Sequence, residues 1–497
     1  MDLFNQFIFY LYNLLTTKDS NNNINEEKIS NYLDYLTNII FDNIFLNLLF
    51  IFSIAVIINL SFNKKKKYKL LIFLNSLIFL IVLILFPINI PFTDSYMEIN
   101  LLFDKETLPY LLNRNEGFLF LIFRFLHIII FKFFNLNYSI IIYFNYLLFI
   151  ISIVLFLGYL KKRDLDNYFI YFILIYFNAK WFVHFYEPVS IVWTINFCLI
   201  LLFIHTLNLK NIYIRNISFI AIYTLSLINF KAGIIIFIYS IIYGLSLRKR
   251  FIEKLFFIIA PIIVFFLINK FLTNDVGIIL KEISVENYIN TIKTNYLFIL
   301  TNFLAIHSLI YDPIIFSKKF IFISITLVQY LYLLHSIFFI KKNPLNNLRN
   351  FILENPLVII GLLGCLLIVI TRENYHYSRY MTFSLLFQLG FFINLFKNKL
   401  IIKYSNKIIR NLLISFFLIS YFINLLITNQ GIFFAFKKNY IYSNVKNCFL
   451  NNQENNRCLK SMFYLTFYDE NKEHYEVFKE DIYQLQKFNL SVFSEID

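Results

Sequence analysis

Long apolar runs separated by short polar segments recur along the chain. Most of them approach the about 20 residues that an α-helix needs to cross a bilayer. Three runs, 168–182, 216–230 and 233–247, are short, which is compatible with a small tilt or a partly re-entrant path. The pattern predicts twelve transmembrane helices, near residues 42–62, 70–91, 138–160, 168–182, 188–207, 216–230, 233–247, 251–272, 320–340, 354–371, 380–396 and 411–428.

The composition strengthens this interpretation. Hydrophobic residues make up 59% of the 497 residues and charged residues 15%, against roughly 25% charged in a soluble domain. Such a chain cannot hide its apolar surface from water, which excludes a soluble enzyme, a disordered protein and a disulfide scaffold. We therefore expect an all-α polytopic membrane protein with about twelve transmembrane helices, outer-face interfacial helices and a small extracytoplasmic C-terminal domain.

The formal net charge of +15 is more useful for inferring the orientation in the membrane than as a sign of nucleic-acid binding. Five short segments, 64–69, 161–163, 248–254, 341–349 and 397–410, together hold 20 of the 45 Lys and Arg residues. The positive-inside rule places all five in the cytoplasm, so both chain ends and the candidate site face outward from a bacterial-type inner membrane. No nucleic-acid partner is expected.

This orientation requires that two further apolar stretches do not cross. Residues 117–135 include Arg124, His127 and Lys132, and residues 296–316 include His307 and Asp312. Polar residues are expensive among lipid tails, whereas an interfacial helix keeps one face wet. We expect both stretches to lie on the outer membrane surface. The alternative is a different number of spans.

The organisation follows from these spans. Residues 1–41 form an N-terminal extracytoplasmic or interfacial segment, with an interfacial helix at 1–16. Residues 42–428 form the transmembrane domain, with its first outer loop at 92–137, and residues 429–497 form a small outer domain. Cys448 and Cys458 lie in that domain, and an oxidising compartment permits a disulfide between them. Cys198 and Cys365 fall in spans and are expected to act as small hydrophobes.

The first outer loop carries acidic residues that are candidates for catalysis. Asp94 lies a few residues past a predicted span, where partial desolvation can raise the pKa of a carboxyl towards that of a useful base. Glu98 follows one helical turn later, and Glu116 lies further along the loop. Ordinary solvated acids in a loop are the alternative interpretation.

Two other outward turns carry polar residues. His184 and Glu187 precede Pro188, a residue that suits the first turn of a helix. An acid favoured by the helix dipole is the simpler interpretation of Glu187. Lys231 lies at the turn between two short spans, where a side chain that reaches back to the interface is the simpler interpretation.

The most polar span end is residues 371–380. Its cations, Arg372 and Arg379, face outward with His376, although the charge rule disfavours them on that side. A guanidinium binds phosphate bidentately, so a lipid phosphate would explain them; anchoring to ordinary headgroups is the alternative. The sequence contains no nucleotide-binding motif and no CxxC or HExxH metal motif.

Taken in order, these positions resemble the type-C glycosyltransferase superfamily, polytopic enzymes that use polyprenyl-phosphate-linked sugars. The resemblance covers about residues 70–497, including the tail segment 489–493. Two features depart from the family pattern: Asp94-Ser-Tyr-Met replaces a tight acidic pair, and an extra span precedes the loop. The matching features are Asp94, helix 117–135, Glu187, Lys231 and the pair Arg379-Tyr380.

The resemblance implies an inverting transferase that moves a hexose or pentose from a polyprenyl-phosphate donor to a glycan or lipid acceptor of the cell envelope. Asp94, Glu98 and Glu187 would be the catalytic acids, with Glu116 and His184 near the acceptor or interface. A divalent cation such as Mg²⁺ or Mn²⁺ suits these oxygen ligands, but nothing requires a cofactor. The donor phosphate would bind Lys231, Arg372, His376, Arg379 and Tyr380.

Two other functions fit parts of the pattern. An outer-face polysaccharide polymerase also joins lipid-linked sugars, although its critical loops usually lie later in the chain. A lipid-linked sugar flippase or transporter would need no chemistry, but would carry charges deep in its spans and broken helices at the midplane. The polar residues of this sequence cluster instead at span ends on one face, which favours the transferase.

Overall fold

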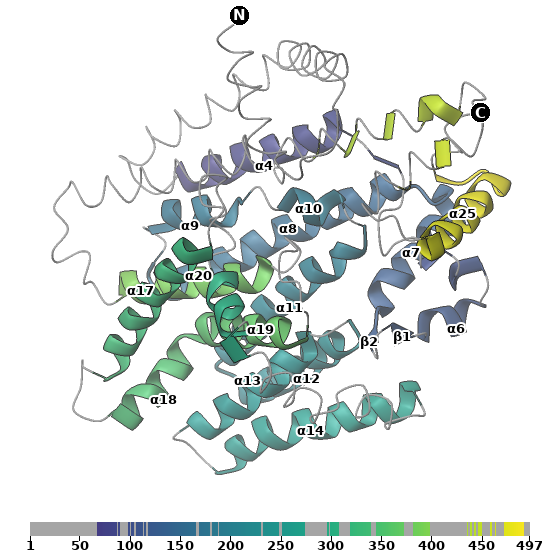
Figure 1. Ribbon diagram of the computed structural model, residues 1–497. Helices are drawn as coiled ribbons and strands as arrows, with labels where there is room; N and C mark the ends of the chain where they lie inside the picture. The colour runs from purple at the N-terminus through teal and green to yellow at the C-terminus, as the bar shows by residue number, and fades with distance from the viewer. Residues whose placement is uncertain are drawn as a thin grey trace, which may run out of the picture. The chain divides into compact units, whose positions relative to one another are not determined.

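The fold is taken from a computed structural model (Figure 1). The chain divides into two compact units, Met1–Val82 and Leu83–Asp497, and every contact given below lies within the second. The structure describes residues 67–86, 88–89, 98–99, 101–103, 106–112, 114–115, 118–165, 168–178, 181–186, 188–229, 232–247, 251–273, 296–297, 299–307, 319–338, 344–371, 381–397, 435, 438–439, 442–443, 446–449, 458–459, 463 and 472–491.

These residues are mostly helical. A short antiparallel hairpin joins strands β1 (Arg114–Asn115) and β2 (Phe118–Leu119). The helices are α4 (Lys67–Leu85), α6 (Thr107–Leu112), α7 (Leu121–Phe134), α8 (Tyr138–Lys161), α9 (Phe169–Tyr176), α10 (Trp181–Tyr186), the 3₁₀ turn η2 (Pro188–Ser190), α11 (Ile191–Leu207), α12 (Ile212–Leu227), α13 (Ala232–Ser246), α14 (Phe251–Thr273), α17 (Lys319–Phe338), α18 (Pro344–Glu354), α19 (Pro356–Thr371), α20 (Met381–Lys397) and α25 (Lys472–Lys487).

Ten of the predicted spans fall on described residues, and each corresponds to helical structure. The predicted spans 42–62 and 411–428, and the predicted helix at 1–16, lie outside the described residues. Within the described part, Tyr138–Lys161 and Phe251–Ile268 are long and apolar enough to cross a membrane. The pair α18–α19, bent by 88°, also passes as one span. A total of twelve spans stays a prediction.

The predicted span 168–182 is broken. Helix α9 ends at Tyr176 and α10 begins at Trp181, so the chain returns along α8 as two short helices. The return is antiparallel, because Asn145 contacts His184 at one end of α8 and Phe156 contacts Phe172 near the other. A cluster of rings around Phe149, including Phe177 and Trp181, fills the break.

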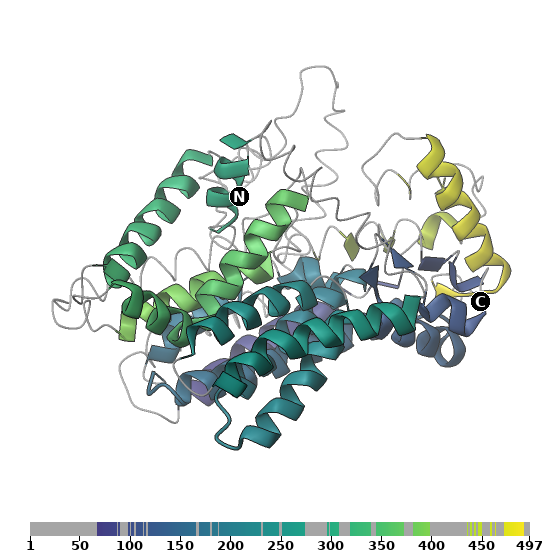
Figure 2. The same ribbon diagram turned by 90° about the horizontal axis from the view of Figure 1, so that it is seen from below.

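Helix α11 then runs parallel to α8. The Cys198 thiol donates to the Leu148 carbonyl at 3.2 Å, and His205 Nε2 lies 2.7 Å from the Leu155 carbonyl; each pair is 50 positions apart. This constant offset shows that both helices begin at the same end of the bundle. Helices α12, α13 and α14 follow as antiparallel neighbours (teal in Figure 2).

Helices α19 and α20 pack unusually closely. A Cβ placed on Gly361 would lie 2.5 Å from the Phe387 backbone nitrogen, and one on Gly390 would lie 2.6 Å from the Val358 nitrogen. Small residues at such a crossing let two backbones approach, which is how helices gain packing energy in an apolar solvent.

Gly361→Ala should therefore destabilise the protein, although Ala is the better helix former. Because the added methyl meets backbone rather than a mobile side chain, we expect a loss of about 1–3 kcal/mol. Gly158→Ala is the matched control, since its Cβ meets only the His205 ring, at 3.3 Å. Thermal unfolding in detergent, followed by tryptophan fluorescence, measures both; equal melting temperatures would contradict the packing argument.

Cations from several of the basic segments gather at one end of the bundle, called here the basic end. Lys162 Nζ lies 3.5 Å from His205 Nδ1 near the ends of α8 and α11. Arg349 donates to the Leu245 carbonyl at 3.3 Å, which joins α18 to the end of α13. Lys397 pairs with Glu354, and the Tyr168 ring stacks on that of Phe396, 4.8 Å away.

Residues 299–307 do not follow the prediction of a helix on the outer surface. The His307 carbonyl accepts hydrogen bonds from Ser384 and Gln388, both at 2.7 Å, and Gln388 lies near the middle of α20. Gln388 also pairs with Gln329, which is near the middle of α17. The helical segment therefore ends near the middle of α17 and α20. There the Ser384 hydroxyl and the Gln388 amide bind its terminal carbonyl, which would otherwise lack a partner away from water.

Candidate functional site

The end of the bundle opposite the basic end brings α7 against the turn between α12 and α13. The Leu121 backbone nitrogen donates to the Ile228 carbonyl at 3.3 Å, and Phe120 forms a β-bridge with Asn229. The Asn229 side chain donates to Asn196 on α11 at 3.1 Å. The first outer loop is thus tied to the start of the helical bundle.

Helix α7 has the opposite orientation from the one expected of a surface helix. Arg124 and His127, expected to face water, are fully buried. The outward face instead exposes Phe125 (55%) and Phe133 (74%) beside the exposed Lys132. The sequence correctly placed a helix here, but its polar face meets protein partners rather than solvent.

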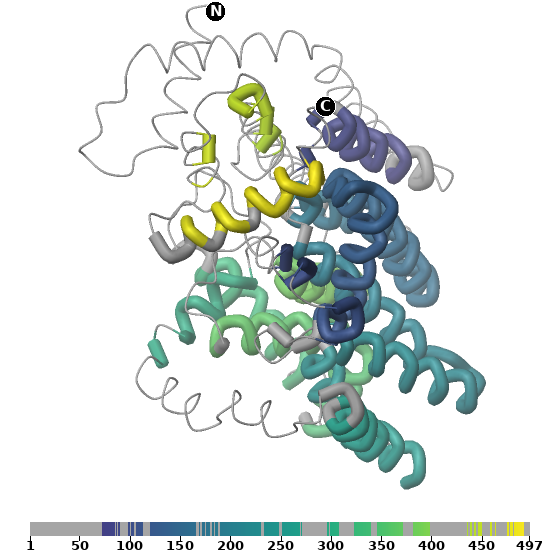
Figure 3. Tube along the Cα trace, turned by 90° about the vertical axis from the view of Figure 1, so that its right-hand side faces the viewer, coloured from purple at the N-terminus to yellow at the C-terminus, as the bar shows by residue number. Residues whose placement is uncertain are grey.

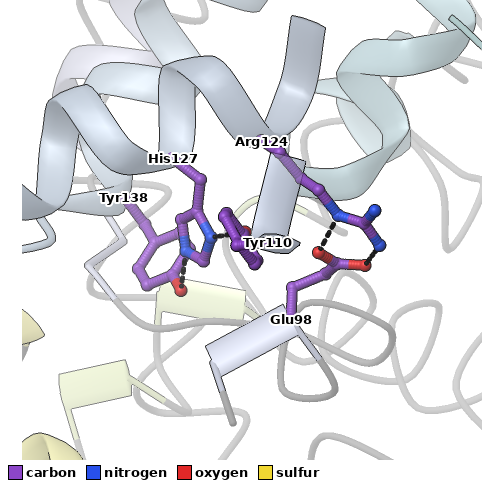
Figure 4. Close-up of polar contacts among 5 residues, drawn as sticks. All are labelled: Glu98, Tyr110, Arg124, His127 and Tyr138. Atoms are coloured by element: carbon purple, nitrogen blue, oxygen red, sulfur yellow. Dashed lines mark hydrogen bonds and ion pairs between the residues drawn. The ribbon is translucent and has the colours of Figure 1, made fainter. Parts of the chain in front are cut away.

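Arg124 owes its burial to Glu98, which the sequence analysis took for a catalytic acid (Figure 4). The guanidinium binds both carboxylate oxygens, with Nε–Oε2 at 2.7 Å and Nη2–Oε1 at 2.8 Å. Glu98 is only 3% exposed. Such a bidentate pair is among the strongest hydrogen-bonded arrangements, so the Glu98 carboxylate is held as a partner of α7 and is not free to act as a base.

A chain of three rings continues from this pair. Tyr110 Oη lies 2.7 Å from His127 Nδ1, and His127 Nε2 lies 2.9 Å from Tyr138 Oη. Arg124 also sits 5.4 Å from the Tyr110 ring centroid, within cation–π range. Neither Tyr110 nor Tyr138 was predicted from the sequence to belong to this site. The sequence did contain one indication that Arg124 and His127 are buried, because they share one helical face that is otherwise apolar.

The protonation states of Tyr110 and His127 limit the hydrogen bonds that they can form. Burial, and next the negative charge of Glu98, raise the pKa of Tyr110 well above its usual value, so Tyr110 stays protonated. The two tyrosine hydroxyls bind the two ring nitrogens of His127, so that one nitrogen donates and the other accepts. This assignment satisfies every polar group of a neutral His127.

Burial lowers the pKa of His127 from 6.5 to about 3, and the charge of Arg124 adds to the shift. Between these values the unfolded chain binds a proton that the folded chain does not. Folding stability should therefore fall as pH drops below about 6.5, by up to about 1.4 kcal/mol per pH unit.

His127→Gln should flatten this acid limb of the stability profile. His335→Gln, at an exposed position of α17, is the matched control and should leave the limb unchanged. Melting temperatures in detergent between pH 7.5 and 4.5 measure both. An unaltered acid limb in the His127 variant would show that other groups cause it.

His184 lies on α10 and was expected near the acceptor or interface. The structure buries its side chain completely, 5.3 Å from the Trp181 ring, and its carbonyl accepts from Asn145 at 2.5 Å. The described position therefore buries the His184 side chain near α8, and contact with an acceptor stays a prediction.

Within the part of the chain that the structure describes, several buried polar atoms near this end have no hydrogen-bond partner. They are Asn145 Oδ1 on α8, Thr194 Oγ1 and Asn196 Nδ2 on α11, and Asn229 Oδ1. Each such atom costs free energy unless water or a ligand binds it. Because α8 and α11 run in register, Thr194 lies level with Asn145, and Asn196 is paired with Asn229. The candidate site therefore borders a polar interior.

Described residues of the C-terminal tail are joined by a disulfide and by ring packing. Cys448 and Cys458 form a disulfide with Cα atoms 5.7 Å apart, the pairing that the sequence suggested. The Phe463 ring packs on Tyr475 and Phe478 of α25, at 5.2 and 5.4 Å. Cys198 and Cys365 are free and buried, as expected of small hydrophobes.

The other predicted site residues lie outside the described residues: Asp94, Glu116, Glu187, Lys231, Arg372, His376, Arg379 and Tyr380. Among the described residues no three His, Cys, Asp or Glu side chains come close enough to hold a metal ion. Of the predicted metal-binding acids, Glu98 is bound by Arg124. Comparison with protein-family models, curated proteins and solved structures finds no match.

Proposed function

We propose that this protein is an integral-membrane glycosyltransferase that moves a sugar from a polyprenyl-phosphate donor to a cell-envelope acceptor on the outer face. One observation carries most of the weight. Described residues close to the predicted positions lie at the end of the bundle opposite the basic end: Tyr186 ends α10, Asn229 follows the end of α12, and Met381 begins α20. Interfacial chemistry needs such a one-sided arrangement.

The proposed reaction is a single displacement. The acceptor hydroxyl oxygen attacks the anomeric carbon, the bond from that carbon to the phosphate oxygen breaks, and the configuration inverts. Asp94 takes the hydroxyl proton as general base. Arg379 and Arg372, with Lys231, stabilise the charge on the departing phosphate. We assign Glu98 a positioning role and no part in proton transfer, because Arg124 binds both oxygens of its carboxylate.

The side of the membrane that the candidate site faces is inferred from the same arrangement. If the basic end is cytoplasmic, as the positive-inside rule requires, the candidate site and the disulfide-bonded tail face outward. An oxidising compartment suits the Cys448–Cys458 bond. Reporter fusions to the 397–410 segment and to the tail test this orientation; a cytoplasmic tail would contradict it.

A lipid-linked sugar flippase is the second candidate, and two observations favour it. The return path α9–α10 is broken, and a cluster of Gln329, Gln388 and His307 lies deep between α17 and α20. Broken helices and buried polar groups are features of transporters. The amides of Gln329 and Gln388, however, bind each other through two hydrogen bonds, of 2.7 and 3.1 Å.

Proteoliposomes test both functions. They would contain one polyprenyl-phosphate sugar from a panel, together with a lipid or glycan acceptor, and both sugar transfer and donor translocation would be followed. Arg379→Ala should lower kcat/KM by roughly 10- to 100-fold, because a bond to a charged group is lost in the donor complex and in the transition state.

Arg163→Ala is the matched control. Arg163 lies beside Tyr159 near the basic end, 4.5 Å from the ring centroid, and should not contact the donor phosphate. Equal losses in both variants would argue against a phosphate site at Arg379. Translocation of the donor without transfer would favour the flippase.

A further inference from the structure

The last described residues of the chain lie against the first outer loop. The Ser491 hydroxyl donates to the Asn89 carbonyl at 2.7 Å, and the Ser491 nitrogen donates to the Asn135 carbonyl at 2.8 Å. The Phe488 ring stacks on the Phe103 ring at 5.1 Å. In Figures 1 and 3 the yellow helix α25 leads to this contact.

Asn89 joins the tail to the start of α8. While its carbonyl binds Ser491, its side-chain oxygen accepts from the Tyr138 backbone nitrogen at 2.9 Å. Tyr138 is the first residue of α8 and also the end of the ring chain through His127. One residue thus connects the tail, the bundle and the buried polar network.

Three described residues near the first outer loop are held by contacts. Asn89 is held by the tail and α8, Glu98 is held by Arg124 of α7, and Phe103 lies between Phe488 of the tail and Phe131 of α7. The tail supplies a partner to Asn89 and to Phe103. In the sequence these two residues flank Asp94, the proposed base.

The backbone at the contact is specialised. Ser491 (φ 57°) and Leu136 (φ 57°) adopt the left-handed region that L-residues rarely adopt. Both residues are fully buried. Such conformations persist where surrounding contacts over-determine them, which indicates a docked arrangement and not an incidental touch of a free chain end.

We propose that the C-terminal tail is a clasp, in which Phe488 and Ser491 are positioning residues that hold Phe103 beside α7 and Asn89 beside α8. The effect of the clasp on sugar transfer rests on the function proposed above. Within the tail, the Cys448–Cys458 disulfide joins two described segments, and Phe463 packs on α25.

Hydrogen exchange with mass spectrometry tests the clasp without any substrate. In full-length protein in nanodiscs, the double variant Phe488→Ala/Ser491→Ala should raise exchange in peptides covering 98–103 and 135–140 by roughly tenfold, since it removes the hydroxyl hydrogen bond to Asn89 and the ring pair with Phe103. Gln486→Ala, at an exposed position of α25, is the matched control. Peptides from α11 should not change and report on the remaining fold.

The single variant Ser491→Asn should keep much of the protection against exchange that the double variant loses. Asn tolerates the left-handed region, and its amide can donate to the Asn89 carbonyl. Unchanged exchange at 98–103 in the double variant would overturn the clasp. Faster exchange throughout α11 would overturn it as well, since the loss would then be global.

Transfer kinetics test the positioning role. The double variant should lower kcat by roughly tenfold while KM for the donor stays constant, because the proposed phosphate ligands lie on other segments. Faster exchange with unchanged kcat would overturn positioning. If the wild-type protein transfers no sugar from any donor in the panel, the proposed function fails, whereas the exchange result still decides whether the clasp exists.

Discussion

Asp94→Asn should lower sugar transfer by about 10²–10⁴-fold while donor binding persists, because a positioned general base contributes about that much. The substitution keeps the shape and the hydrogen-bonding capacity of the side chain and removes only its basicity. Transfer from a polyprenyl-phosphate sugar in proteoliposomes measures the rate, and binding of the labelled donor measures affinity.

Glu106→Gln is the matched control for this experiment. Glu106 is an exposed carboxylate of the same loop, one residue before α6. It carries the same charge, so its neutralisation should leave transfer near the wild-type rate. If Asp94→Asn transfers normally and Glu187→Gln does not, the base is misassigned. If no acidic variant in either outer loop matters, the enzyme proposal fails.

Glu98→Gln needs a different interpretation from the one the sequence alone suggests. A loss of transfer in this variant would not identify a base, because Glu98 binds the buried Arg124. Its melting temperature must therefore be measured beside its rate. Loss of activity with loss of stability identifies a positioning residue, and loss of activity at full stability would return Glu98 to a chemical role.

The sequence predicted the long helices well. Helix α8 was expected at 138–160 and runs Tyr138–Lys161, and α14 was expected at 251–272 and runs Phe251–Thr273. Uninterrupted apolar runs bounded by polar residues leave little freedom in such helices. The break between α9 and α10 was not predicted, because the run continues through Phe177 and Asn178 without a Pro or Gly.

Helix α18 (Pro344–Glu354) was also missed. It falls in a stretch that was counted as a cytoplasmic loop, and it is followed by the sharp bend into α19. Two Pro residues mark its limits: Pro344 opens α18 and Pro356 opens α19. Proline favours the first turn of a helix, so the signal was present in the sequence but was outweighed by the basic residues around it.

The candidate site was harder to predict from the sequence than the long helices. Spacing shows that Arg124 and His127 share a helical face, but it does not show whether that face meets water or a protein partner. The answer depends on Glu98 and Tyr138, which lie 26 and 11 positions away from their respective partners. The contact between Ser491 and Asn89, separated by 402 positions, has no local signal at all.

The Glu98–Arg124 pair should be the most sensitive point of the described fold. Arg124→Met would leave the Glu98 carboxylate buried and unpaired, and breaking a buried ion pair in this way typically costs about 3–5 kcal/mol. Glu98→Gln should also be destabilising, because it leaves the buried Arg124 guanidinium without a counter-charge, and a guanidinium cannot become neutral by losing a proton. Thermal unfolding in detergent, followed by tryptophan fluorescence, ranks the two variants.

The double variant Glu98→Gln/Arg124→Met shows whether an unpaired charge or lost packing causes the loss of stability in Arg124→Met. It removes both charges and keeps comparable volume, so it should recover most of the stability lost in Arg124→Met. Lys397→Met/Glu354→Gln is the control cycle, since that pair is exposed and should couple weakly. If the double variant is less stable than Arg124→Met alone, the loss comes from packing of the long side chain and not from an uncompensated buried charge.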